Sequence, residues 1–328
     1  MSGAGTRRGE FELIAALFAP LSKGAPGALG LTDDAALIDV APGCSLVTTV
    51  DTVIAGVHFR SDDPPDLIAR KALRVNLSDL AAKGAKPVGF LHALALNDGI
   101  DDAFLERYAA GLAADVTEFG VPLLGGDTTS GPGPLSITIT AFGVVEKGKA
   151  LLRSGARRGD VLCVSGTIGD GALGLACLNH DLEISTVLSD ELVARYELPQ
   201  PRLAAGRALA GLATACLDVS DGLVADVGHL CAASGLAAVI GRYTLPLSAG
   251  ARSAVEQDAR WWDEILGGGD DYELAFSIPP DRLADLQSIA SRLKLPLTPI
   301  GTLTPGQGVT VIADGKPCAL ERTGYRHR

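Results

Sequence analysis

Short apolar segments rich in β-branched residues alternate with segments of helical periodicity along this chain of 328 residues. Such alternation is typical of α/β proteins, and the length is sufficient for two domains. A charged stretch, Glu146-Lys147-Gly148-Lys149, separates two sets of these segments. We therefore expect α/β architecture with mixed sheets in two domains, an N-terminal one over residues 1–148 and a C-terminal one over residues 149–328.

Local patterns predict the individual elements. Phe11, Ile14, Ala15 and Phe18 recur at helical spacing, which favours a short helix over residues 10–18 that packs through this stripe. Further strands are expected over residues 46–50, 88–96, 136–145, 161–165, 214–217, 272–278 and 309–312, and further helices over residues 66–83, 102–119, 201–213, 222–233 and 280–293.

The composition argues against several classes of protein. No apolar run approaches the roughly 18 to 20 residues that a membrane-spanning helix needs. Arg7 and Arg8 precede a short apolar stretch, but Glu10 and Glu12 interrupt it, so a secretion signal is not expected. The six cysteines form no Cys-x-x-Cys pair, which indicates a reducing cytoplasm and no zinc site.

The net charge of −11 repels a phosphate backbone, so nucleic acid is not the expected partner. Nucleotides are anions as well, and an acidic protein that handles them needs divalent cations as a bridge. The positions of the aspartates therefore matter most.

Aspartates recur where apolar segments meet turns. The turn preference of Asp explains any single case, but many such places in one chain indicate a shared role. Carboxylates that face one pocket repel each other unless hard cations lie between them, and Mg²⁺ prefers oxygen ligands. These aspartates are Asp33 and Asp34, Asp51, Asp127, Asp218 and Asp221, and Asp270 and Asp271, joined by Asp79 in a helical polar stripe with Asn76 and Lys83.

Four further positions have both a structural and a functional interpretation. Gly126, in Gly-Gly-Asp127-Thr-Thr, lets the backbone approach a phosphate while the aspartate holds a metal ion. Ser220 and its neighbour Asp221 precede a helix and are either N-caps or ligands. His58 and Arg153 are either ordinary structural residues or contacts to substrate and phosphate.

Two other motifs suggest different functions. Residues 169–174 fit the Gly-x-Gly-x-x-Gly pattern of dinucleotide-binding proteins, although Asp170 brings a negative charge into the turn that would hold pyrophosphate. Asp218 and Asp221 superficially resemble the pair in aspartate-nucleophile phosphatases, but their spacing is three residues instead of two. The chain has no phosphate-binding P-loop motif.

Seven motifs together resemble the thiamine-monophosphate kinase family, in order and spacing, from about residue 9 to the C-terminus. They are Leu31-Thr-Asp-Asp-Ala-Ala-Leu, Asp51-Thr-Val-Ile-Ala-Gly-Val-His-Phe, Lys71-Ala-Leu-Arg-Val-Asn-Leu-Ser-Asp-Leu-Ala-Ala-Lys-Gly-Ala, Gly125-Gly-Asp-Thr-Thr, Arg153-Ser-Gly-Ala, Leu217-Asp-Val-Ser-Asp-Gly-Leu and Gly268-Gly-Asp-Asp-Tyr-Glu-Leu.

The resemblance implies a two-domain fold of the aminoimidazole ribonucleotide synthetase-like superfamily, in which the N-terminal sheet pairs across a homodimer. It also implies ATP as co-substrate, several Mg²⁺ ions and thiamine monophosphate as acceptor. By position, the implied metal ligands are Asp34, Thr49, Val50, Asp51, Asp79, Asp127, Asp218 and Asp221. The implied ATP contacts are Gly126, Asp127, Arg153 and Ser220, and the implied acceptor contacts are His58, Asp270 and Arg322.

Four residues depart from the family pattern. Thr32 replaces a glycine, and Val50 replaces a hydroxyl residue, which leaves only its backbone as a metal ligand. Asp270 replaces a glutamate, and Arg322 replaces an aromatic residue. These departures concern the fit of the substrate more than phosphate transfer.

The implied reaction is direct in-line transfer of the γ-phosphate to thiamine monophosphate, with Asp51, Asp79, Asp127 and Asp221 as the catalytic carboxylates. A phosphate monoester has its second pKa near 6, so the attacking oxygen is already ionised and no catalytic base is required. The alternatives are another kinase or synthetase of the superfamily, such as the selenophosphate or hydrogenase-maturation enzymes with their reactive cysteines, and a silent nucleotide-binding sensor.

Overall fold

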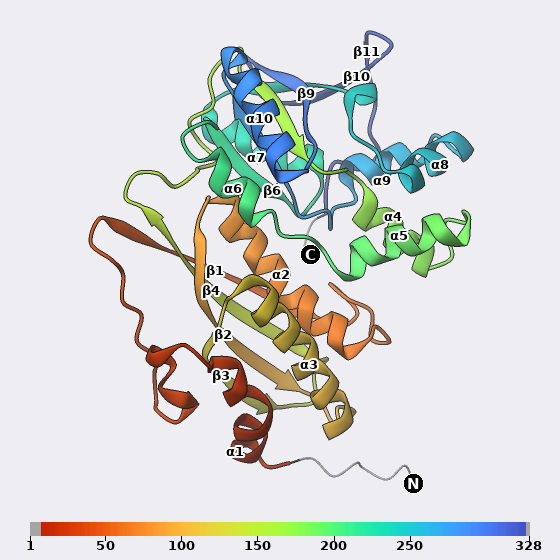
Figure 1. The fold of residues 1–328 in the computed structure, drawn as a ribbon. Helices are drawn as coiled ribbons and strands as arrows, with labels where there is room; N and C mark the ends of the chain where they lie inside the picture. Colours follow the sequence, from red (N-terminus) through yellow and green to blue (C-terminus); the bar gives the residue numbers. More distant parts are fainter. Residues whose placement is uncertain (1–7, 326–328) are drawn as a thin grey trace. The chain divides into compact units, whose positions relative to one another are not determined.

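The structure is a computed structural model that describes residues 8–325 (Figure 1). The chain divides into two compact units, one of residues 1–80 and 86–148 and the other of residues 81–85 and 149–328. Each unit contains one sheet with its own helices. Within the described range, no helix is both long enough and apolar enough to cross a membrane.

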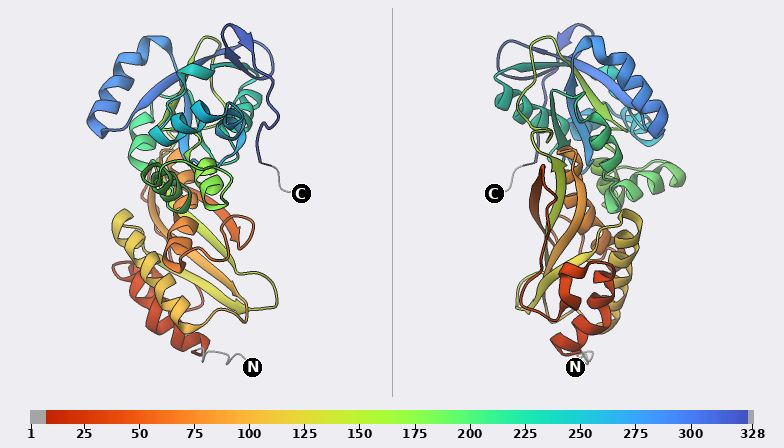
Figure 2. Two further views of the ribbon diagram at one scale, coloured as in Figure 1. Left: turned by 90° about the vertical axis from the view of Figure 1, so that its right-hand side faces the viewer. Right: turned by 60° about the vertical axis from the view of Figure 1, so that its left-hand side comes forward.

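The first unit is built on a four-stranded sheet with the order β1-β4-β2-β3. Its strands are β1 (Cys44–Ile54), β2 (Lys86–Leu96), β3 (Leu123–Ser130) and β4 (Ser136–Glu146). Neighbours pair antiparallel except β2 and β3, which are parallel. Two helices, α2 (Pro65–Ala82) and α3 (Asp102–Phe119), lie against one face of this sheet (Figure 2).

The two faces of this sheet differ in exposure. Apolar residues of β2 and β4, among them Phe90 and Ile139, are fully buried. On the other face of β1, Leu46 is 42% exposed and Val50 is 59% exposed. Large apolar side chains that remain open on a strand indicate a surface that binds a partner or ligand.

Helix α3 shows why its ends were predictable. The Asp101 side chain accepts a hydrogen bond from the N–H of Phe104 at 2.8 Å, which caps the first turn. At the other end, Gly120 adopts a left-handed conformation with φ of 61°. The predicted range of 102–119 therefore agrees with the structure.

A buried ion cluster joins α2 to α3. Arg74 is 1% exposed and donates from Nε to Asp115 Oδ2 at 2.7 Å and from Nη2 to Oδ1 at 2.9 Å. Arg70 donates to the same carboxylate at 2.8 Å, and both arginines also reach Glu118. The Arg74 guanidinium lies 5.0 Å from the centre of the Phe119 ring. Because this ion cluster fixes α2 to α3, the residues of α2 that contact β1 are held in place as well.

The N-terminal segment corrects one prediction. It forms a short helix, α1 (Glu10–Leu13), followed by a π-helical turn over Ile14–Phe18 and two 3-10 turns over Ala19–Ser22 and Pro26–Leu31. Leu13 and Phe18, five residues apart, are buried, whereas Phe11 is 84% exposed. The expected packing of Phe11 was wrong, because a π turn repeats at i+5 instead of i+4.

The second unit is built on a seven-stranded mixed sheet with the order β11-β10-β7-β9-β5-β8-β6. Its strands are β5 (Val161–Ser165), β6 (Ala215–Val219), β7 (Ala237–Gly241), β8 (Glu273–Ile278), β9 (Leu297–Thr304), β10 (Gly308–Ala313) and β11 (Lys316–Pro317). Its helices are α4 (Asp170–Leu178), α5 (Thr186–Glu197), α6 (Leu203–Leu209), α7 (Leu223–Ser234), α8 (Ala249–Gln257), α9 (Trp261–Gly267) and α10 (Leu283–Leu293).

Helices cover both faces of the larger sheet (Figures 1 and 2). On β5 and β6, Cys163 and Cys216 pack with residues of α6 and α10. The alternate residues Leu162 and Leu217 pack with residues of α4, α7 and α9. The central strands are thus buried on both sides, which explains their continuous apolar sequences.

Several predicted turns are strands. Asp51 lies inside β1, Asp127 lies inside β3, and Asp218 lies inside β6. The glycines before Asp127 misled the prediction of a turn there. A Cβ on Gly126 would lie 1.9 Å from the carbonyl oxygen of His92, so this glycine permits close approach of β3 to β2.

Replacing Arg74 with Met should lower the free energy of unfolding by about 3 kcal/mol, because the carboxylate of Asp115 stays buried with only part of its compensation. The double variant Arg74→Met with Asp115→Leu should recover most of this loss, since neither charge then remains buried. Denaturation in urea measures both values. An equal loss in the single and double variants would contradict the explanation.

Candidate active site

A cavity of about 550 Å³ opens in the first unit, beside β3 and the N-terminal segment. Its apolar walls come from side chains such as Ile14, Leu31 and Phe142. Its polar lining includes Asp33, Asp34, Gly126, Asp127, Thr128, Thr138 and Thr140. The structure therefore brings the predicted ligands Asp34, Gly126 and Asp127 together, although about 90 residues separate them in sequence.

The carboxylates of Asp34 and Asp127 are exposed and accept no hydrogen bond from residues 8–325 in the structure. Asp34 is held through its backbone, since its N–H donates to Asp33 Oδ1 at 2.8 Å. Asp127 is placed by the pairing of β3 with β2, where it lies opposite Ala93. Both side chains are thus positioned by the backbone and available to a ligand.

A second polar cluster lies where α2 crosses β1. The Thr49 hydroxyl donates to Asp79 Oδ2, and the N–H of Asp51 donates to Asn76 Oδ1 at 3.1 Å. Asn76 is 1% exposed and also donates to the carbonyl of Ala72 at 3.0 Å. Both Thr49 and Asp51 are thus tied to α2, Thr49 directly through Asp79 and Asp51 through Asn76.

Asn76 was not among the predicted site residues. The available signal was its spacing of three residues from Asp79 on one helical face. Its role became visible only in the structure. The side-chain oxygen of Asn76 accepts a hydrogen bond from the N–H of Asp51 on the outer side of β1, an edge strand of the described sheet.

The two clusters of the first unit are separate. Strands β1 and β3 are at opposite ends of the sheet, three strand spacings or about 14 Å apart. In the register of the sheet, Asp51 pairs with Ile139, Ile139 with His92, and His92 with Gly126. Asp127 is therefore displaced by one residue from the row that contains Asp51. Alternation then directs Asp51 and Asp127 to opposite faces. Among the described residues, no group of three or more His, Cys, Asp or Glu side chains is placed to hold a metal ion.

Val50 is the least favoured of the predicted ligands. Because Asp51 directs its N–H away from β4 toward Asn76, alternation turns the backbone N–H and carbonyl of Val50 toward Thr140 of β4. Its side chain lies on the exposed face.

His58 follows β1 in a turn. Its Nδ1 accepts a hydrogen bond from the N–H of Ile54 at 3.1 Å, so the neutral ring carries its proton on Nε2. The hydrogen bond from Ile54 therefore fixes the orientation of the ring.

In the second unit, a buried carboxylate organises the loop after β6. Asp226 Oδ2 accepts hydrogen bonds from the N–H groups of Ser220, Asp221 and Gly222 at 3.0, 3.0 and 3.1 Å. Burial first, and then the charge of Asp221, raise the pKa of Asp226 to about 7. Asp226 was missed because it lies inside an apolar helix, where its sequence context gives no sign of this contact.

The loop before β8 adjoins the loop after β6. The N–H of Asp270 donates to the carbonyl of Ser220 at 2.9 Å, and the N–H of Tyr272 donates to that of Val219 at 2.8 Å. Asp218, the remaining predicted ligand of this unit, is 6% exposed on β6. The structure therefore brings Asp270 next to Ser220 and Asp221.

Two predicted residues are placed less tightly. Arg153 is exposed in the loop before β5, and its carbonyl accepts from the Ser234 hydroxyl at 3.3 Å. Arg322 pairs with Glu264 at 3.0 Å. The N–H of Tyr325, three residues after Arg322, donates to the carbonyl of Asp221 at 2.8 Å. This hydrogen bond holds the segment around Tyr325 against the loop after β6.

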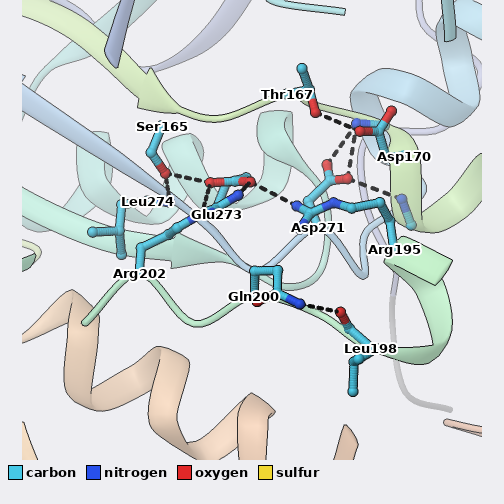
Figure 3. Close-up of polar contacts among 12 residues, drawn as sticks. Ser165, Thr167, Asp170, Arg195, Leu198, Gln200, Arg202, Asp271, Glu273 and Leu274 are labelled. Carbon is cyan, nitrogen blue, oxygen red and sulfur yellow. Dashed lines mark hydrogen bonds and ion pairs between the residues drawn. The ribbon is translucent and has the colours of Figure 1, made fainter. Parts of the chain in front are cut away.

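The glycine-rich turn at residues 169–174 does not bind a dinucleotide in the manner its pattern suggests. The N–H groups of Gly169 and Gly171, which would meet pyrophosphate, donate to the carboxylate of Asp271 (Figure 3). Asp170 is buried beside them. The chain itself therefore fills the anion position of this turn.

Three of the cysteines, Cys163, Cys216 and Cys231, are fully buried. Burial raises the pKa of Cys163 and of Cys216 to about 12, and that of Cys231 to about 11. Such thiols stay protonated and are poor nucleophiles. All six cysteines lie in the described range, and none forms a disulfide.

Comparison with known proteins agrees with this fold. Residues 32–145 match the AIR synthase related protein, N-terminal domain, and residues 157–314 match the AIR synthase related protein, C-terminal domain. The paired domains thus define an AIR synthase related protein, and the expected fold class is confirmed.

Individual relatives are more specific. The chain is 42% identical to thiamine-monophosphate kinase of Escherichia coli K12 over 324 residues, which cover 97% of this chain and 98% of the relative. It is similar to the crystal structure of thiamine-monophosphate kinase from Stenotrophomonas maltophilia K279a, with 40% identity, a TM-score of 0.85 and coverage of 94% and 98%. It also matches AaThiL complexed with AMPPCP and TMP, with 31% identity, a TM-score of 0.78 and coverage of 98% and 99%. The chain belongs to the thiamine-monophosphate kinase family.

His92 generates a prediction about pH. It lines the cavity, is 4% exposed and shares a 2.7 Å hydrogen bond from Nε2 with the hydroxyl of the buried Tyr108. Burial lowers the pKa of His92 to about 3. The unfolded chain binds the proton first, so the contribution to stability is complete above about pH 6.5 and is lost as the pH falls toward 3.

Between pH 7 and pH 5, the free energy of unfolding of the wild type should therefore fall by about 2 kcal/mol more than that of His92→Gln, which does not titrate. Chemical denaturation at the two pH values measures the difference. Parallel losses in both proteins would show that His92 is not the responsible group.

Proposed function

We propose that this protein transfers the γ-phosphate of ATP to the phosphate of thiamine monophosphate and so forms thiamine diphosphate. One observation carries the proposal. The cavity that gathers Asp34, Gly126 and Asp127 occurs in a chain that matches, over 98% of its length, a protein solved as a complex with AMPPCP and TMP. AMPPCP has the triphosphate of ATP with a carbon in the last bridge, so it supports ATP as the donor.

The lining of the cavity suits a nucleotide. Apolar side chains such as Phe18, Leu31 and Phe142 offer contact area for a base, while the carboxylates and threonines lie on one part of the lining. Free phosphates would be repelled by Asp34 and Asp127, so nucleotide binding at these residues requires cations.

The available donors fit Mg²⁺. They are carboxylate and hydroxyl oxygens, which are hard ligands. In each cluster of the first unit, two of the carboxylates are predicted ligands, Asp34 and Asp127 beside Asp33 at the cavity, and Asp51 and Asp79 at the second cluster. This number suits Mg²⁺, which is usually held by one or two carboxylates and by substrate phosphates. When bound, Mg²⁺ would offset the repulsion between two phosphate groups and stabilise charge on the group in transfer.

The roles of individual residues are part of the proposal. The metal ligands are Asp34, Thr49, Asp51, Asp79, Asp127, Asp218 and Asp221, with Val50 contributing least. Gly126, Arg153 and Ser220 contact ATP, and His58, Asp270 and Arg322 contact thiamine monophosphate. In support, the ring of His58 is held in one orientation by the hydrogen bond that it accepts from the N–H of Ile54, and Asp270 adjoins Ser220.

The transfer is direct, without a phosphorylated protein intermediate. The acceptor phosphate is ionised near neutral pH, so it attacks without a general base. The buried thiols of Cys163 and Cys216, with raised pKa values, are unsuited to act as nucleophiles.

A homodimer belongs to the same proposal. The exposed apolar residues Leu46 and Val50 provide a surface that a second copy would cover. The separation of Asp51 from Asp127 within one chain also favours the participation of a second chain. Sedimentation of the protein at the mass of a single chain would contradict it. We place the enzyme in the cytoplasm, in keeping with its six free cysteines.

Incubation with ATP, Mg²⁺ and thiamine monophosphate should yield thiamine diphosphate, detected by chromatography, and product should disappear when the metal is chelated. Rapid quenching with γ-labelled ATP should place label on the product alone. ATP consumption without thiamine diphosphate would indicate another acceptor of the superfamily, and no ATP consumption would favour a nucleotide-binding sensor.

Asp127→Asn should lower kcat by at least about a hundredfold, because a neutral amide no longer supports cation binding in the cavity. The fold should persist, since the side chain is exposed. Asp98→Asn, an exposed aspartate of the same unit outside the cavity, is the matched control. Activity within a few-fold of wild type in Asp127→Asn would remove this residue from the proposed metal ligands.

A further inference from the structure

The loop between α9 and β8 holds an unusual backbone conformation. Asp270 and Tyr272, on either side of Asp271, have positive φ values of 63° and 51°. This left-handed conformation costs an L-residue roughly 1 kcal/mol or more, so it persists only where neighbouring contacts enforce it. The carboxylate of Asp271 makes contacts that hold the loop, and so do the N–H groups of Asp270 and Tyr272.

Asp271 anchors the loop to the start of α4. Its carboxylate, on a side chain only 2% exposed, accepts from the N–H of Gly169 at 2.9 and 2.8 Å and from the N–H of Gly171 at 3.2 Å (Figure 3). The start of a helix presents N–H groups without helical partners and favours a negative charge. The carboxylate of Asp271 thus caps α4 from a residue about 100 positions away.

The backbones of the loop and α4 lie in direct contact. A Cβ on Gly171 would come within 2.2 Å of the carbonyl oxygen of Asp270, and one on Gly268 would come within 2.3 Å of the Ala172 Cβ. Glycine is required at both places because no side chain fits there. The position of Asp270 is therefore determined by α4 and by the anchor of Asp271.

The same loop is fixed on its other side to the loop after β6. The N–H of Asp270 donates to the Ser220 carbonyl, and a Cβ on Gly269 would lie 2.4 Å from that oxygen. The loop after β6 is held in turn by Asp226, through the N–H groups of Ser220, Asp221 and Gly222. Two buried carboxylates thus hold two adjoining loops, each through backbone N–H groups.

We propose that Asp271 is a positioning residue for the acceptor: it fixes Asp270 in the conformation that contacts thiamine monophosphate, whereas Asp226 fixes Ser220 and Asp221 for ATP and metal. This inference rests on the proposed function, which assigns Asp270 to the acceptor. Asp271 itself does not touch substrate, because its carboxylate is buried against Gly169 and Gly171.

The test compares full-length Asp271→Ala with Asp226→Ala, since both changes remove a buried carboxylate that binds backbone N–H groups. Asp271→Ala should raise the KM for thiamine monophosphate by roughly tenfold or more, the equivalent of one lost hydrogen bond to a charged group, with the KM for ATP changed much less. Asp226→Ala should show the opposite pattern.

The conservative variant provides a second measurement. In Asp271→Asn the amide oxygen still accepts from Gly169 or Gly171, so the KM for thiamine monophosphate should return part of the way to the wild-type value. This variant also serves as the test if Asp271→Ala does not fold. Gly171→Ala keeps the carboxylate but displaces the carbonyl of Asp270, so it should also raise this KM.

The outcomes are distinguishable. If the wild type forms thiamine diphosphate but Asp271→Ala changes both KM values equally, or neither, Asp271 serves stability alone and the inference is wrong. Failure of Asp271→Ala, Asp271→Asn and Gly171→Ala to fold would lead to the same conclusion. If the wild type forms no thiamine diphosphate, the proposed function itself fails, and the acceptor role of Asp271 fails with it.

Discussion

The loops of the second unit depend on one interaction, a buried carboxylate that accepts several backbone N–H groups. Asp226 holds residues 220–222 in this way, and Asp271 holds the turn at Gly169 and Gly171. A carboxylate that accepts several N–H groups fixes the backbone that donates them, and such hydrogen bonds are strong when the acceptor is charged. Because β6 and β8 are antiparallel neighbours, the loop after β6 and the loop before β8 lie at the same end of this strand pair. Half-buried residues such as Ser220 and Asp270 gain a fixed position from carboxylates that are themselves buried.

The aspartates of this chain thus divide into two kinds by burial. Asp34 and Asp127 are exposed on a cavity and suited to a cation, whereas Asp115, Asp226 and Asp271 are buried and compensated by arginines or backbone N–H groups. An uncompensated buried carboxylate costs several kcal/mol in folding free energy. Each buried carboxylate is therefore accompanied by partners, which it holds in fixed positions. The aspartates therefore contribute to the architecture, and the exposed ones are available for chemistry.

Much of the fold followed from the sequence because its signals are local. Helix α3 has an aspartate cap and a terminal glycine, and its limits were predicted to the residue. Strand β9 was not predicted, because its sequence mixes glycine, proline and threonine with apolar residues and gains its strand conformation from neighbours already in the sheet. Strand β7, only five residues long, was not predicted either. The π turn at Ile14–Phe18 was not predicted either, since no periodicity in so short a segment distinguishes it from an α-helix.

By itself, the sequence determined the candidate ligands, because side-chain oxygens and glycines at fixed spacings are properties of the chain. It also determined the family, through motifs whose order is fixed along the chain. Only the tertiary structure decided which of these residues meet: Asp34 joins Asp127 at the cavity, while Asp51 lies on the far strand and the other face of the same sheet. Strand order and register arise from long-range pairing, which no local pattern encodes. For the same reason, Asn76, Asp226 and Asp271 acquired a role only when backbone groups distant in sequence came within hydrogen-bonding distance.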